Sequence, residues 1–169
     1  IDVLRPGVTK VAASLMAKLC SGAAYMCCFD GSVVGEQGRR QAGSGACLFR
    51  IHSDGRKAHR VHAFDRTVYL GDATVDRAEY AGLLAGTLTF EAWLPSLIPV
   101  PGMLLVEGDS KTVVTHVRVS FENPQRSFNL EEDPLLQPIF NEIVKALRRI
   151  ASQDVKIVIR HRPRRFNKA

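Results

Sequence analysis

The sequence has few cysteines, no long apolar run and no internal repeat. No apolar stretch approaches the ~18 residues of a membrane-spanning helix, so we expect no membrane partner. There is no CxxC pair, which argues against a zinc site. We read the cysteines as buried reduced thiols, which favours an intracellular compartment, whether cytoplasmic, nuclear or mitochondrial. They are Cys20, Cys27, Cys28 and Cys47.

Acidic residues are missing from the end of the chain, residues 155–169, which nevertheless carries six basic residues. This stretch accounts for the whole net charge of +6. A second basic region is opposed only by Asp54 and contains Arg39, Arg40, Arg50, Arg56, Lys57 and Arg60. Clustered basic residues suit a polyanionic partner such as RNA, and the alternative is a solvated basic surface with no partner.

The length of 169 residues allows one domain with a substantial core, which we place at residues 23–169 after an N-terminal extension at 1–22. Apolar patterning predicts strands at residues 24–29, 46–51, 59–70, 103–106 and 155–159. It predicts helices at residues 75–94, 111–119 and 131–150, the last with an acidic first turn. This order indicates an α/β fold with a mixed five-stranded sheet covered by helices.

Three acids stand where predicted elements end or begin. Asp30 follows the first strand, Asp109 follows the fourth, and Glu79 lies near the start of a helix. If those two strands are parallel neighbours, both aspartates reach the same sheet edge and Glu79 can join them. Crowded carboxylates repel each other, and Mg²⁺ or Mn²⁺ relieves the repulsion. Taken singly, each acid could instead be a turn residue, a helix-dipole residue or a cap.

Four segments, in this order, carry a resemblance to a known family. They are Tyr25-Met-Cys-Cys-Phe-Asp-Gly-Ser with Gly43-Ser-Gly-Ala, Asp76-Arg-Ala-Glu-Tyr-Ala-Gly-Leu-Leu, Leu105-Val-Glu-Gly-Asp-Ser-Lys-Thr-Val-Val, and Ile159-Arg-His-Arg-Pro-Arg-Arg-Phe-Asn-Lys-Ala. Over residues 24–169 the chain resembles the compact ribonuclease H family, including the ribonuclease H domains of reverse transcriptases.

The resemblance implies a metal-dependent endonuclease that hydrolyses the RNA strand of RNA–DNA hybrids with two Mg²⁺ or Mn²⁺ ions. Asp30, Glu79 and Asp109 would be the catalytic residues and the metal ligands. The expected nucleic-acid contacts are Gly43, Ser44, Gly45, Arg77, Arg162, Arg164, Arg165 and Asn167.

The sequence departs from the family at its end. The family has a fourth carboxylate just beyond the motif that here runs from Arg164 to Ala169, and we expect that Asp within about two residues of the end. The last helix of the family is also missing from residues 23–169.

An alternative function stays open because of these departures, because of the N-terminal extension, and because the chain has 16 arginines against seven lysines. It is a catalytically inactive module that binds RNA or scaffolds a ribonucleoprotein assembly, as part of a larger chain or complex. A third possibility is another nuclease or strand-transfer enzyme of the same superfamily.

Overall fold

The computed structural model describes residues 22–36, 38–51, 58–64, 73–126, 128, 130 and 133–164, with residues 58–64 described as backbone alone. The strands are β1 (Ala23–Val34), β2 (Gln41–Ile51), β3 (Ala58–Phe64), β4 (Pro101–Gly108) and β5 (Lys156–His161). The helices are α2 (Val75–Trp93), the short 3₁₀ helix η1 (Leu94–Ser96), α3 (Lys111–Glu122) and α4 (Leu136–Ala151).

The strands form one mixed sheet in the order β3-β2-β1-β4-β5. The neighbours β1, β2 and β3 pair antiparallel, because short connections return the chain alongside itself. The pairs β1–β4 and β4–β5 are parallel, and helices supply the crossovers that parallel strands need. The prediction of an α/β fold with a mixed sheet is confirmed.

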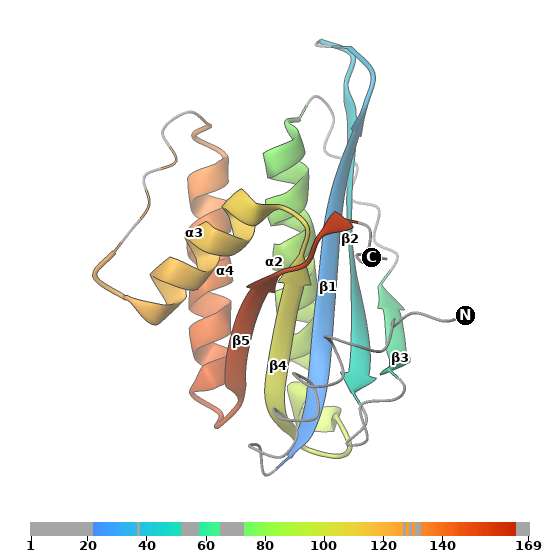
Figure 1. The fold of residues 1–169 in the computed structure, drawn as a ribbon, viewed down its shortest axis with the longest axis vertical. Helices are drawn as coiled ribbons and strands as arrows, with labels where there is room; N and C mark the ends of the chain where they lie inside the picture. Colours follow the sequence, from blue (N-terminus) through green and yellow to red (C-terminus); the bar gives the residue numbers. More distant parts are fainter. Residues whose placement is uncertain are drawn as a thin grey trace.

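The helices cover one face of this sheet, as Figure 1 shows. Strand residues such as Phe29, Leu104 and Val106 pack there against Leu83 of α2, Val113 of α3 and Leu147 of α4, all at most 2% exposed. The opposite face carries a smaller apolar cluster whose members all lie on strands. It contains Met26, Cys28 and Leu105, with Phe49, Ile51 and Val158 beside them.

β1 does not end at residue 29 and β2 does not begin at residue 46, so both of these predicted bounds are wrong. β1 continues to Val34 and pairs with β2 from Val34–Gln41 back to Ala24–Ile51. The polar, glycine-rich composition at residues 30–45 suggested a loop, but the backbone ladder holds it extended. The stretch is therefore a hairpin that extends the sheet.

The last helix begins later than predicted. The prediction began it at residue 131, whereas α4 starts at Leu136 and has no acidic residue in its first turn. Asp133 instead forms the turn before the helix, with its Oδ1 accepting from the Leu135 N–H at 3.1 Å and its carbonyl from the Leu136 N–H at 2.9 Å. Pro134 favours this turn. The last turn of α4 is basic, with Arg148 and Arg149.

Other predicted features agree with the structure where it describes them. α2 agrees with the predicted range to within one residue, and the hydroxyl of Thr74 caps its first turn. Ser110 caps α3, which begins at the predicted residue. Cys27, Cys28 and Cys47 are buried. Within the described ranges no helix has the length and hydropathy needed to cross a membrane. Residues 1–21, Cys20 and residues 65–70 of the predicted third strand lie outside those ranges.

Candidate functional site

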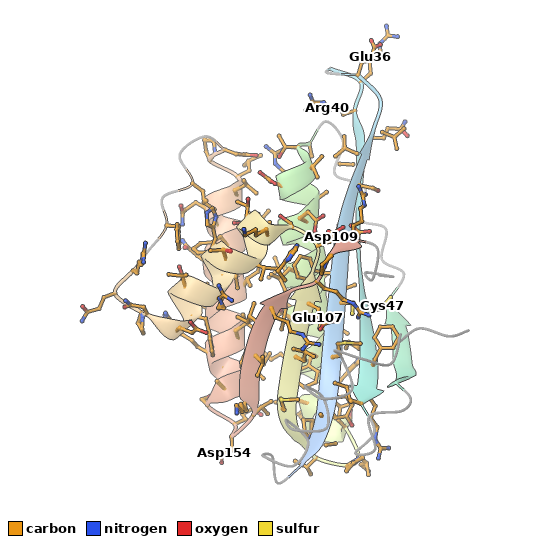
Figure 2. All side chains as sticks on the ribbon, in the orientation of Figure 1. Glu36, Arg40, Cys47, Glu107, Asp109 and Asp154 are labelled. Carbon is orange, nitrogen blue, oxygen red and sulfur yellow. The ribbon has the colours of Figure 1, made fainter. Side chains whose placement is uncertain are left out.

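Three carboxylates from three elements meet at one edge of the sheet. Parallel pairing places Phe29 of β1 beside Gly108 of β4, so the residues that follow, Asp30 and Asp109, lie at the same end. Glu79 projects from the second turn of α2, which packs on β1. One carboxylate oxygen of each acid lies within 4.8 Å of the other two. We call Asp30, Glu79 and Asp109 the acidic cluster, and Figure 2 labels Asp109 within it.

Two glycines let α2 approach closely enough for Glu79 to reach this edge. A Cβ at Gly31 would lie 2.4 Å from the backbone nitrogen of Glu79. A Cβ at Gly82 would lie 2.9 Å from the carbonyl oxygens of Asp30 and Gly45. Neither position has room for a side chain, so the helix backbone packs directly on β1 and β2.

Burial and repulsion between carboxylates favour the protonated forms of Glu79 and Asp30. Burial, together with the charges of Asp109 and Asp30, raises the pKa of Glu79 from 4.5 to about 8. Burial and then the charge of Asp109 also raise the pKa of Asp30, although the Gly31 N–H opposes this by donating to Oδ1 at 2.9 Å. A positive charge at this edge would relieve the repulsion.

The acidic cluster fits a divalent cation. Oε2 of Glu79 is buried and has no hydrogen-bond partner within the described part of the chain. A buried carboxylate oxygen without a partner is unfavourable unless a cation or a donor satisfies it. Three hard oxygen donors converging from separate elements suit Mg²⁺ or Mn²⁺.

The predicted nucleic-acid contacts at residues 43–45 lie beside the acidic cluster. Gly45 pairs with Asp30 across the β1–β2 ladder, and Ser44 and Gly43 are the next residues along β2. The hydroxyl of Ser44 is buried and has no partner among the described residues. On the other side, Nε of Arg164 lies 3.6 Å from Oδ2 of Asp109, and the Arg164 side chain is 83% exposed.

Solved structures of low sequence identity have the same architecture. The N-terminal RNase H domain of Rv2228c from Mycobacterium tuberculosis is 21% identical with a TM-score of 0.56, and the match covers 86% of each chain. LC11-RNase H1, isolated from compost, is 19% identical in its complex with an RNA/DNA hybrid. That match has a TM-score of 0.54 and covers 85% of this chain and 88% of the other.

The chain has the ribonuclease H fold. It is also similar to the protease–reverse transcriptase of prototype foamy virus, at 19% identity and a TM-score of 0.56. That match covers 83% of this chain and 17% of the viral protein, so it concerns one part of a longer polypeptide. No family model and no curated protein matches the sequence.

Within this ribonuclease H fold, two arginines that were predicted to contact nucleic acid are held by acids. Arg162 is 8% exposed, and its Nη1 donates to Oε2 of Glu107 at 2.9 Å, which leaves little of its surface for a nucleic acid. Arg77 forms a bidentate ion pair with Asp133, with N–O distances from 2.7 to 3.0 Å. The remaining two candidates, Arg165 and Asn167, lie outside the described residues.

Glu107 is a residue of this region that the sequence analysis missed. It is fully buried on β4, two residues before Asp109, and it pairs with both Arg160 and Arg162. These ion pairs tie β4 to β5 on the strand segment that leads into Asp109. A charged residue between Val106 and Gly108 suggested the end of a strand, whereas the two arginines allow the strand to continue through it.

Replacing Glu79 by Gln is expected to stabilise the protein when divalent ions are removed. A raised folded-state pKa means that the folded state holds a proton that the unfolded state releases between pH 4.5 and about 8. The wild type therefore loses stability as pH rises through that window, whereas the Gln variant does not. At about pH 9 we expect the free energy of unfolding of the Gln variant to exceed that of the wild type by about 2 kcal/mol, and this difference should vanish near about pH 4.

Urea unfolding in EDTA across this pH range measures the difference in free energy of unfolding between the wild type and Glu79→Gln. Adding Mg²⁺ should reduce it, because a bound cation stabilises the ionised wild-type carboxylate. A Gln variant less stable than the wild type at high pH would show that the acids do not repel each other as described.

Proposed function

We propose that the chain is a divalent-metal-dependent endonuclease that hydrolyses the RNA strand of RNA–DNA hybrids. The observation that carries the proposal is the acidic cluster, whose carboxylate oxygens lie within 4.8 Å of one another at one edge of a ribonuclease H fold. The likeness to LC11-RNase H1, solved with an RNA/DNA hybrid, supports the choice of substrate.

Each cluster residue has a proposed role. Asp30, from the centre of the sheet, would hold two ions of Mg²⁺ or Mn²⁺ together with Glu79 and Asp109. When bound, such ions supply an activated water and neutralise charge on the leaving oxygen. The protein holds the three carboxylates in place through the β1–β4 ladder and through the close packing of α2. The ligand geometry is thus set by rigid elements rather than by loops.

The surroundings of the acidic cluster would orient the RNA strand. Residues 43–45 lie beside Asp30 and would contact 2′-hydroxyl groups, which distinguish RNA from DNA. Arg164, exposed next to Asp109, would bind a phosphate. Hydrolysis adds water across the P–O3′ bond and leaves a 5′-phosphate on one fragment and a 3′-hydroxyl on the other.

The test is cleavage by the full-length protein of a hybrid with labelled RNA, compared with double-stranded RNA and single-stranded DNA. We expect Mg²⁺-dependent cleavage of the hybrid, none in EDTA, and 5′-phosphate products. Binding of the hybrid without hydrolysis, by a folded preparation in Mg²⁺ and in Mn²⁺, would instead support a catalytically inactive binding module. Preferential cleavage of another substrate would support a different nuclease of the superfamily.

A further inference from the structure

The hairpin that joins β1 and β2 projects beyond the rest of the sheet, as Figure 1 shows. We call its outer part, residues 33–36 and 38–42, the arm. The arm is paired backbone rather than a loose loop, because the ladder continues through Val33–Ala42 and Val34–Gln41. At its base, Ala42 is 2% exposed and packs with Ala73 and Ala78, which fixes the direction of the arm relative to α2.

The turn at the end of the arm is compact. Gly35 and Gly38 have φ angles of +102° and +86°, which favour glycine. The Arg39 N–H donates to the carbonyl of Glu36 at 2.9 Å and closes the turn. A Cβ at Gly35 would lie 2.8 Å from the carbonyl oxygen of Arg39, so the two sides of the turn touch. The arginines that follow are therefore presented on an ordered ribbon.

The arm offers two arginines that have no acidic partner among the described residues. Arg39 is exposed and Arg40 half-buried, and the ion pairs found within the described ranges involve other arginines. The acid of the arm, Glu36, lies at its tip, and Figure 2 places Arg40 between that tip and Asp109 of the acidic cluster. Val34, 71% exposed, is the large apolar side chain exposed on the arm. One such side chain is too little for the core of a protein interface, whereas two arginines on a ribbon suit phosphates.

The length of the arm sets which phosphates it reaches. Asp30 pairs with Gly45, and Arg40 lies five residues before Gly45 in the sequence, next to the first residue of β2. At about 3.3 Å per residue in a strand, Arg40 lies about 16 Å from the acidic cluster. On the scale of B-form DNA, whose rise is about 3.4 Å per base pair, this distance corresponds to about five base pairs.

We infer that the arm is a second phosphate-binding surface, which grips the duplex through Arg39 and Arg40 about five base pairs from the scissile phosphate. This inference rests on the proposed function for its substrate but concerns a different part of the molecule. The arm binds the backbone of the duplex and does not contact the reacting atoms. It therefore contributes to affinity and leaves the hydrolytic step unchanged.

The test compares the wild type with the double variant Arg39→Ala/Arg40→Ala on hybrids of about 8 and about 20 base pairs. Binding is measured by fluorescence anisotropy without divalent ions, and cleavage is measured separately in Mg²⁺. On the longer hybrid we expect the Kd and KM of the double variant to rise about tenfold with kcat unchanged. The slope of the logarithm of the binding constant against the logarithm of the salt concentration should fall in magnitude by about 1 to 2. On the shorter hybrid we expect less than about a twofold change, since a central cut leaves about four base pairs on either side.

Two further variants sharpen this result. Lys145→Ala/Lys156→Ala removes the same charge from an exposed position on α4 and from the start of β5, and the latter lies at the end of the sheet away from Asp109. This variant should bind both hybrids as the wild type does. Glu36→Gln removes the acid at the tip and should tighten binding of the longer hybrid about twofold. Thermal unfolding of each variant verifies that the fold is intact.

Equal losses on both hybrids, no loss on either, or an equal loss in the Lys145/Lys156 variant would overturn the inference. Binding of poly-glutamate, a model of an acidic protein, is measured in parallel. If the Arg39→Ala/Arg40→Ala variant loses poly-glutamate binding while its hybrid binding is unchanged, the inference is also overturned, and the arm would instead bind an acidic protein partner. If the double variant loses affinity for the longer hybrid alone but the wild type cleaves neither hybrid, the proposed hydrolysis fails while the phosphate-binding role of the arm stands.

Discussion

Replacing Asp30 by Asn is expected to slow hybrid cleavage at least about a thousandfold, equivalent to about 4 kcal/mol of transition-state stabilisation. Asp30 is the strand residue that faces both Glu79 and Asp109, and the amide removes the negative charge that a shared cation requires. Hybrid affinity without divalent ions should change less than about threefold, since the contacts to phosphate and 2′-hydroxyl groups remain.

The matched control is Asp154→Asn. Asp154 is exposed in the turn between α4 and β5, and Figure 2 places it at the end of the molecule away from Asp109. Its φ of 62° is one that Asn also adopts readily, so the backbone should be unaffected. The single-turnover rate of hybrid cleavage is measured for both variants and compared. Activity of Asp30→Asn within tenfold of the control would show that hydrolysis does not use this carboxylate.

Replacing Glu107 by Ala is expected to lower the free energy of unfolding by about 3–5 kcal/mol. The substitution leaves the Arg162 guanidinium, 8% exposed, without its carboxylate in the interior of the sheet. Arg160→Ala should cost about 1 kcal/mol, because the side chain of Arg160 is partly exposed and Glu107 keeps its other partner. Urea unfolding at neutral pH measures both.

A double variant separates the loss of the ion pair from the burial of an unpaired charge. Glu107→Leu/Arg162→Met removes both charges and should recover most of the stability lost in Glu107→Ala. If Glu107→Ala costs less than about 1 kcal/mol, water reaches Arg162 and the buried network described here is wrong.

Much of the fold was predictable because hydrophobic periodicity and capping residues are local signals. The helix at residues 75–94 and the cap at Ser110 are recorded in the sequence within a few neighbouring positions. The hairpin arm was missed because glycines and polar residues between Asp30 and Gly45 resemble a loop. Their extended conformation depends on pairing with each other and on packing of α2, which are tertiary effects.

The site shows the same division between local and tertiary information. The placement of Asp30, Glu79 and Asp109 at ends of elements could be inferred from their neighbours in sequence. The role of Glu107 could not, because its two arginines are more than fifty positions away. For the same reason a count of basic residues places Arg162 on the surface, whereas its partner holds it inside. Charge composition predicts a polyanionic partner but not which arginines are free to bind it.

The central claim, that the acidic cluster binds divalent cations, is tested most directly by titrating the full-length protein with Mn²⁺ and measuring bound ion by electron paramagnetic resonance. We expect saturable binding to the wild type and to Asp154→Asn, weakened at least about tenfold in Asp109→Asn. Equal binding to all three proteins, or no binding to a folded wild type, would contradict the account.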